Sequence, residues 1–311
     1  MSGGDSTRIV CSSNKAHKHS VLNASGTSLA LWHYPGAEEI AGLADPSSGH
    51  VNGPTAGSPV ILSHGTFSNH RSCRGLAQYL AKRGFDCWIL DFQGHGQSEA
   101  PCSEPDFESM CLEDVQAALE FVSEWTFNEP ISWVGHSGGG LAALMYLARN
   151  SERQSQIGKL TILASQATHA GVNSRNRVGI QLCKIVTRLL KMAPGRWLNI
   201  GPENEFAKVM LQWYQWSLDG RWLGEDGFDY EIALQQVELP LQCFAGAGDL
   251  FIAPVEGCRH LFDCYGGSDK IFHFCGTETG YKEDYSHARI ISSGSAAKEI
   301  WPNIADWLQF S

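Results

Sequence analysis

One serine stands in a setting that can make its hydroxyl a nucleophile. The stretch Gly135-His136-Ser137-Gly138-Gly139 follows an apolar run, 131–134, and precedes a helical pattern that ends at Arg149. A G-x-S-x-G pattern at a strand-to-helix turn allows a strained serine backbone, because the glycines two positions away carry no side chain. The helix N-terminus favours negative charge beside the hydroxyl. The pattern therefore predicts that Ser137 attacks a carbonyl group, with a purely structural turn as the alternative.

A serine nucleophile needs a base, and the base needs a carboxylate to orient it. His287 follows the last expected strand, 270–275, from where a loop can bring its imidazole back over Ser137. Asp249 follows an expected strand at 239–245, so its carboxylate should lie at the same edge of the sheet. We predict His287 as the base and Asp249 as the acid. Asp249 has a second interpretation, as the cap of the following helix.

Other acids and histidines fit these roles less well. Asp284 is the rival acid, but it is so close in sequence to His287 that it would reach the far imidazole nitrogen only awkwardly. His273 lies within an expected strand, His260 lies within an expected helix, and His169 lies where a helical insertion begins. These three positions favour packing or substrate contact over base chemistry.

The negative charge that forms on an attacked carbonyl needs hydrogen-bond donors. The backbone N–H of Gly138 is one predicted donor, and the N–H of Thr66 or Phe67, in the loop after an earlier strand, is the other. We expect His64 to brace this loop rather than to transfer protons. We expect His95, in a Gly-His-Gly bend, to have a structural role, since no acid that would pair with it is evident in the sequence.

The elements that must position these residues alternate between strand and helix. Buried strands are expected where apolar residues run continuously, at 60–63, 86–91, 131–134 and 159–164. Helical patterns lie between most of them. Such alternation predicts the α/β class, with a mostly parallel sheet that has helices on both faces.

Between 168 and 238 the alternation stops. Helical patterns run over 180–192 and 205–218, with many aromatic residues and no convincing central strand. We therefore expect a core in two parts, 1–167 and 239–311, with a helical cap at 168–238 inserted between them. The residues expected to contact substrate are His136, His169, Trp213 and Trp216. The cap aromatics suit an apolar substrate, although they could equally form the cap's own core.

Composition excludes several classes of partner. The 311 residues carry a formal net charge of −10, which offers no basic surface to nucleic acid. No stretch is apolar enough to span a membrane, and the first twenty residues contain no apolar run of the kind found in signal peptides, so we expect a cytoplasmic protein.

The ten cysteines form no C-x-x-C pair and are expected to be free thiols. His17 and His19 are expected in a frayed, solvated terminus, and no metal or organic cofactor is implied.

Taken together, these motifs resemble the α/β-hydrolase superfamily, in its serine esterase and lipase-like branch. The resemblance runs from about Val21 to the C-terminus and rests on the following segments: His64-Gly65, Asp91-Phe92-Gln93-Gly94-His95-Gly96-Gln97-Ser98, Gly135-His136-Ser137-Gly138-Gly139, Gly248-Asp249 and His287. It implies the α/β-hydrolase fold, the same three catalytic residues and oxyanion donors, and a lid formed by the helical insertion. Gln93 and Ser286 depart from the residues frequent in relatives. A serine at position 137, in the turn between strand and helix, argues against the branches of the superfamily that use aspartate at this position.

The sequence thus predicts a serine hydrolase that cleaves a carboxylic ester or thioester with an apolar acyl or alkyl portion, through an acyl-enzyme. An acyltransferase or an amidase would use the same residues. A ligand-binding receptor on the same fold, without turnover, is the alternative of a different class.

Overall fold

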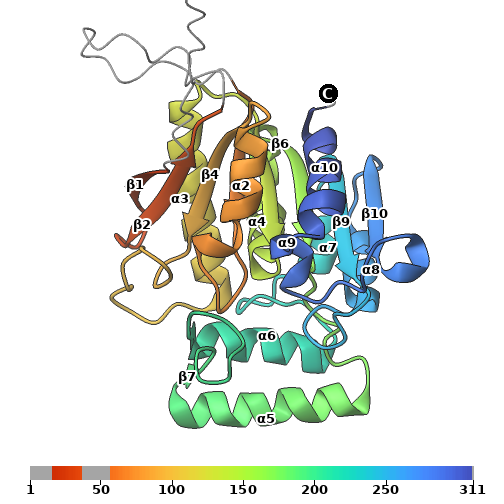
Figure 1. Ribbon diagram of the computed structural model, residues 1–311. Coiled ribbons are helices and arrows are strands. Elements are labelled where there is room, and N and C mark those ends of the chain that lie inside the picture. Colours follow the sequence, from red (N-terminus) through yellow and green to blue (C-terminus); the bar gives the residue numbers. More distant parts are fainter. Residues whose placement is uncertain (1–15, 37–56, 310–311) are drawn as a thin grey trace, which may run out of the picture.

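An eight-stranded sheet forms the centre of the protein (Figure 1). The computed structural model describes residues 16–36 and 57–309. The strands are β1 His17–Leu22, β2 Ser28–Tyr34, β3 Pro59–Ser63, β4 Asp86–Asp91, β5 Ile131–His136, β6 Ile157–Leu163, β9 Leu241–Gly246 and β10 Lys270–Cys275. Their order in the sheet is β1-β2-β4-β3-β5-β6-β9-β10. The antiparallel pairs are β1–β2 and β2–β4, and all the others are parallel. The prediction of a mostly parallel sheet is confirmed.

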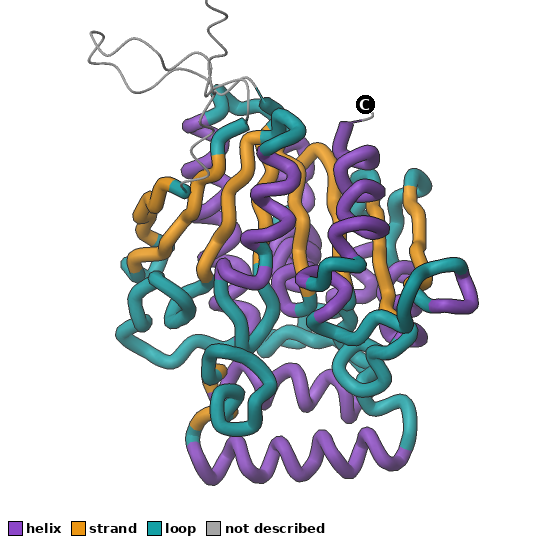
Figure 2. Tube along the Cα trace, viewed as in Figure 1, coloured by secondary structure: helices purple, strands orange, loops and turns teal. Residues whose placement is uncertain are grey.

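Helices cover both faces of this sheet (Figures 1 and 2). One face carries α2 Arg74–Ala81, α9 Arg289–Ser292 and α10 Ala296–Gln309, which contact one another. The other face carries α3 Phe107–Trp125, α4 Gly138–Arg149, α7 Tyr230–Leu234 and α8 Val255–Cys264. Every residue of β3, β4 and β5 is buried, because helices shield both faces of these central strands. This explains their continuous apolar sequences.

Helix α3 begins five residues before the helical pattern that the sequence shows. The Asp106 carboxylate accepts the Ser109 N–H at 2.7 Å, which caps the first turn. The Gln212 side chain, from a distant segment, accepts the Phe107 N–H at 2.8 Å. These partners satisfy backbone donors that a helix start otherwise leaves unpaired. The second of them could not be foreseen from local sequence.

The expectation of a frayed terminus at His17 and His19 is wrong. Both residues belong to β1, which pairs with β2 along its whole length. His19 packs against the rings of Trp88 and Trp125, with ring centroids 5.2 and 5.0 Å away. Residues 37–56 and the chain before residue 16 lie outside the described residues.

The segment 168–238, which we call the cap segment, contains two helices that lie beyond one end of the sheet (Figure 1). They are α5 Ser174–Leu190 and α6 Ala207–Asp219, and the two-residue strands β7 Met192–Ala193 and β8 Glu205–Phe206 pair between them. The last helix of the segment, α7, packs instead on α4 and α8 of the core layer. Among the described residues, no helix combines the length and apolar character that crossing a bilayer requires.

Strand β5 and helix α4 cross so closely that Gly135 leaves no room for a side chain. A Cβ at Gly135 would lie 2.4 Å from the Gly140 backbone nitrogen. We therefore expect Gly135→Ala to lower the free energy of unfolding by about 2 kcal/mol or more, as overpacking does. Gly158→Ala is the matched control, because a Cβ there would meet Pro130 at an ordinary 3.4 Å. Urea unfolding of both variants measures the difference, and equal stability would contradict the close crossing.

Candidate active site

The backbone of Ser137 is strained, and its surroundings hold it so. Its φ is 54° and its ψ is −120°, between the end of β5 and the first turn of α4. A Cβ at Gly139 would lie 2.5 Å from the Ser63 hydroxyl, and a Cβ at Gly65 would lie 2.7 Å from the Ser137 Cβ. Only glycine lets these three segments approach so closely. The arrangement leaves the Ser137 side chain at the wall of a cavity.

The structure brings His287 and Asp249 together. Their Nδ1 and Oδ2 atoms are 2.5 Å apart. Burial raises the pKa of the Asp249 carboxyl, but the hydrogen bond and charge of His287 outweigh it and lower this pKa below its ordinary value. Because a carboxylate only accepts hydrogen bonds, Nδ1 of His287 carries the proton and Nε2 is left with a lone pair. That tautomer can accept a proton from a hydroxyl.

Ser137 and His287 line the same cavity. Among the described residues, no hydrogen bond joins the Ser137 hydroxyl to the imidazole. In ligand-free sites such hydrogen bonds are often long and tighten only when substrate is bound. The carboxylate of Asp284, the rival acid, has a different partner: it accepts the Thr277 N–H at 2.7 Å in an exposed turn.

The backbone N–H groups predicted to bind the oxyanion differ in whether they already have a hydrogen-bond partner. Gly138 is the first residue of α4, so its N–H has no partner within the helix. A Cβ at Gly138 would lie 3.4 Å from the Thr66 nitrogen, so the backbones of these two residues are close together. The Phe67 N–H instead donates to the buried Glu205 carboxylate at 3.3 Å. This corrects the prediction of Phe67 as a donor, and Thr66 is the better candidate.

The cavity has a volume of about 190 Å³, and its wall is mainly apolar. It lies between the sheet edge and the inner side of the cap segment. The cap segment and the 249–253 loop contribute the residues Cys183, Ile200, Met210, Trp213, Tyr214, Phe251 and Ile252. Of the residues expected to contact substrate, Trp213 lines this cavity.

His136 does not line the cavity, which corrects its expected role. Its Nε2–H donates to the backbone carbonyl of His287 at 2.8 Å. Burial and the neighbouring His287 ring lower the pKa of His136 to about 3, so it stays neutral. His136 therefore holds the loop that carries the base, while its side chain remains behind the site.

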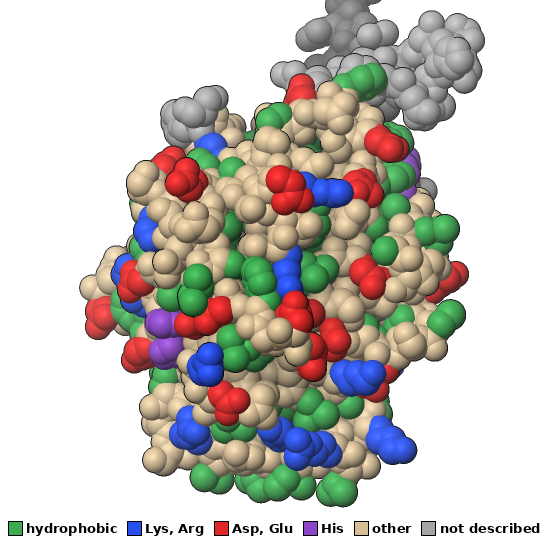
Figure 3. Space-filling model, turned by 180° about the vertical axis from the view of Figure 1, so that it is seen from behind, with side chains coloured by type: hydrophobic (Ala, Val, Ile, Leu, Met, Phe, Trp, Pro, Cys, Tyr) green, Lys and Arg blue, Asp and Glu red, His purple; other side chains and the backbone are tan. Residues whose placement is uncertain are grey.

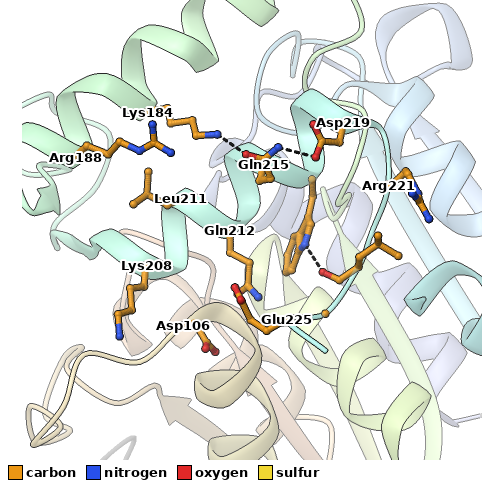
Figure 4. A pocket seen from close by; sticks show the side chains of 13 residues that line it. Asp106, Lys184, Arg188, Lys208, Leu211, Gln212, Gln215, Asp219, Arg221 and Glu225 are labelled. Atoms are coloured by element: carbon orange, nitrogen blue, oxygen red, sulfur yellow. Dashed lines mark hydrogen bonds between the residues drawn. The ribbon is translucent and has the colours of Figure 1, made fainter. Parts of the chain in front are cut away.

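His169 and Trp216 also lie outside the cavity, contrary to expectation. The His169 ring packs on His260, with centroids 4.2 Å apart, and its Nδ1 is 2.8 Å from the Thr168 hydroxyl. Trp216 lines a separate hollow of about 890 Å³ between α5, α6 and the loop 221–225 (Figure 4). Its indole N–H donates to the Leu223 carbonyl at 2.7 Å, which fixes the ring there.

A buried ion pair that the sequence did not reveal joins the core to the cap segment. The His95 Nε2 lies 3.1 Å from Oε2 of Glu205, and both side chains are almost fully buried. Burial lowers the pKa of His95, but the charge and hydrogen bond of Glu205 outweigh it and raise this pKa to about 9. The same carboxylate oxygen holds the Phe67 N–H. This pairing fits the structural role expected for His95. Its partner Glu205 lies 110 residues away in sequence, so the motif around His95 does not reveal it.

His64 braces the loop in the way that its position suggested. Its Nδ1 lies 2.8 Å from the Gly65 carbonyl, and its Nε2 accepts the Phe92 N–H at 3.2 Å. Burial, followed by the nearby His95 charge, lowers the pKa of His64 to about 4. A neutral His64 thus connects the loops after β3 and β4.

One group of side chains in the described ranges has the geometry of metal ligands. The donor atoms of Glu231, His260 and Cys264 lie within 4.8 Å of one another. None of the three lines the cavity beside Ser137. They are already connected, because His260 lies 2.9 Å from the Glu231 carboxylate. The proposed chemistry at Ser137 does not involve this group.

The sheet order and the strained serine between β5 and α4 are those of the α/β-hydrolase fold. A family model described as the alpha/beta hydrolase fold matches residues 58–182. The AB hydrolase superfamily protein YisY of Bacillus subtilis is 32% identical over 137 residues, which cover 44% of this chain and 46% of that protein. A probable alcohol acetyltransferase of Saccharomyces cerevisiae is 33% identical over 103 residues, 32% of this chain and 28% of that protein.

Among solved structures, an esterase from Exiguobacterium antarcticum superimposes with a TM-score of 0.66 at 14% identity, covering 94% of this chain and all of that one. The chain spans less than half the length of the curated relatives that it matches. The chain thus has the α/β-hydrolase fold that the motifs implied, and part of it is similar in sequence to α/β hydrolases.

The His95–Glu205 pair predicts a loss of stability at high pH. The folded-state pKa of His95 is about 9 against an ordinary 6.5, so its contribution is complete below pH 6.5 and is lost as the pH rises through 9. The pKa of Glu205 is lowered, so that group stays ionised across this window. We expect wild type to lose up to about 3 kcal/mol more stability than His95→Gln between pH 6 and pH 9.

Urea unfolding at several pH values measures this difference. Glu205→Gln is the matched variant, because removing the carboxylate should remove the raised pKa and flatten the same curve. A pH dependence that is identical in wild type and in both variants would contradict the pairing.

Proposed function

We propose that the protein is a serine hydrolase that cleaves a carboxylic ester with an apolar acyl or alkyl portion. The observation that carries this proposal is the 2.5 Å contact between His287 and Asp249, with His287 and Ser137 on the wall of one cavity. A hydroxyl, an imidazole and a carboxylate in this order are the components of nucleophilic acyl transfer. A cytoplasmic location remains a prediction of the sequence.

In the proposed reaction, Nε2 of His287 accepts the Ser137 proton as the hydroxyl attacks the ester carbonyl. The N–H groups of Gly138 and Thr66 would hold the resulting oxyanion. The imidazolium then gives its proton to the leaving alcohol, and an acyl-enzyme forms. Water activated by the same imidazole releases the acid. Asp249 keeps the imidazole in the required tautomer throughout.

The volume of the cavity limits how much of the substrate it can enclose. Its volume of about 190 Å³ is below the usual range of about 300–1,000 Å³ for ligand pockets. Leu141, Met210 and Trp213 offer apolar contact within it. We therefore expect short or slender apolar acyl groups to react faster than bulky or charged ones.

Transfer of the acyl group to an alcohol is the second candidate. It is favoured by the likeness to a protein named a probable alcohol acetyltransferase, although the match covers only 28% of that protein. Transfer and hydrolysis differ only in whether an alcohol or water takes the acyl group from Ser137. Products formed in ¹⁸O-labelled water with an added alcohol separate the two. Anilide substrates test the amidase alternative.

A fluorophosphonate probe tests the nucleophile directly. We expect the probe to modify Ser137, as identified by peptide mass spectrometry, and Ser137→Ala to lower kcat/KM for p-nitrophenyl esters by at least about 10³-fold. The same substitution at the exposed Ser103 is the control and should leave both readouts unchanged. A folded protein that is labelled elsewhere, or that keeps its turnover without Ser137, would overturn the assignment of Ser137 as nucleophile. A folded wild type that neither reacts with the probe nor turns over esters would favour the receptor alternative.

The acid can be tested with a matched pair of substitutions. Asp249→Asn should lower kcat by about 10³-fold or more, because an amide cannot hold the His287 tautomer in the same way. Asp284→Asn changes the other acid near His287 in sequence but removes only contacts to Thr277, so activity should be retained. Circular dichroism confirms that both variants fold. Loss of activity in Asp284→Asn alone would assign the role to Asp284.

A further inference from the structure

Helix α5 is amphipathic, but its apolar side faces solvent, whereas the apolar side of an ordinary surface helix faces the core. Four large apolar side chains at helical spacing face solvent on its outer side: Val178, Leu182, Ile185 and Leu189, with exposed fractions of 60%, 59%, 51% and 78%. Val186 and Leu190 extend the same face. In a soluble helix such a stripe faces the protein core. An exposed stripe of this size marks an interaction surface.

Polar contacts on the inner side fix α5 in this orientation. Lys184 is 9% exposed as a residue, and its ammonium donates to the Gln215 side chain of α6 (Figure 4). The Asn176 amide donates to the Ala170 and Leu250 carbonyls, both at 3.0 Å. Rotating the helix to bury its leucines would break these hydrogen bonds and expose the polar atoms they satisfy. The outward apolar face is therefore a consequence of the packing.

The apolar face continues into the turn after α5. Trp197 is 77% exposed there, and Leu198 and Ile200 are about half exposed. Figure 3 shows apolar side chains along the lower edge of the molecule, with Lys and Arg side chains just above them. A tryptophan at the border of an apolar surface is typical of membrane interfaces, where the ring lies at headgroup level.

Charge distinguishes this surface from the rest of the chain. The stretch 168–202 contains six basic and no acidic residues, in a chain with a formal net charge of −10. Four of the basic side chains are exposed and, within the part of the chain that the structure describes, form no ion pair with a carboxylate: Arg175, Arg177, Arg188 and Lys191. A basic helix with an outward apolar face lies in the plane of an anionic lipid surface.

We propose that the outer face of α5 and the 196–200 turn dock on an anionic lipid surface, with the apolar side chains inserted below the headgroups. A second copy of this chain fits less well, because a twofold contact would bring the same basic residues of both copies together. The inner side of this segment contributes Cys183 and Ile200 to the cavity beside Ser137. Docking would thus bring that cavity next to lipid, a consequence that rests on the proposed function.

Vesicle flotation of the full chain carrying Ser137→Ala tests the docking independently of hydrolysis. We expect binding to vesicles of phosphatidylcholine mixed with phosphatidylglycerol, weaker binding to phosphatidylcholine alone, and weakening by salt. Leu182→Gln with Leu189→Gln should lower the partition onto mixed vesicles roughly tenfold or more, since both side chains would insert. Arg188→Gln with Lys191→Gln should remove most of the preference for the anionic lipid.

The matched control is Leu22→Gln with Phe127→Gln. These side chains are equally exposed, at 67% and 66%, but lie in β1 and in the turn after α3, outside the cap segment. The control should bind vesicles like its parent, and thermal unfolding of all variants should match. Unchanged partition in the Leu182/Leu189 variant would overturn the proposal. So would a parent that does not bind vesicles but is a dimer that these substitutions dissociate.

Discussion

The site depends on one steric constraint, the close crossing of β5, the loop after β3 and the first turn of α4 at Ser137. A non-glycine residue with a φ of 54° costs about 1–3 kcal/mol, so the surrounding packing must enforce it. Gly65, Gly135 and Gly139 allow that packing, because a Cβ at any of them would lie within 2.7 Å of another atom. The same crossing brings the backbones of Gly138 and Thr66 close together. The proposed nucleophile and the proposed oxyanion donors therefore depend on a single local geometry.

The cap segment takes part in this geometry through buried polar contacts. Glu205 accepts hydrogen bonds from the Phe67 N–H and pairs with His95, so one cap carboxylate holds two core loops. Gln212, from α6, caps the first turn of α3 in the same way. A buried charge that loses its partner is costly, which ties the position of β8 to that of the loop beside Ser137. Movement of this part of the cap segment would therefore disturb the loop beside Ser137 as well as the cavity wall.

Sequence patterns predicted what local geometry determines. The parallel sheet followed from continuous apolar runs. The places of Ser137, Asp249 and His287 after strands predicted that they lie at one edge of the sheet, and the structure has His287 against Asp249 and on the same cavity wall as Ser137. What the sequence could not show depends on contacts between distant segments. Trp213 and Trp216 lie three residues apart on α6, yet they line different hollows. Glu205 looked like an ordinary residue at a helix start, and only the fold brings it to His95.

Periodicity also cannot tell which side of an amphipathic helix faces water. The spacing of Val178, Leu182, Ile185 and Leu189 predicts a helix with one apolar face, and the usual inference would bury that face. The structure instead buries Lys184 and Asn176, because partners for their polar groups lie on α6 and near β9. An apolar stripe that satisfied polar contacts leave exposed to water marks a surface for interaction with a partner. The basic residues around it favour an anionic surface as that cover.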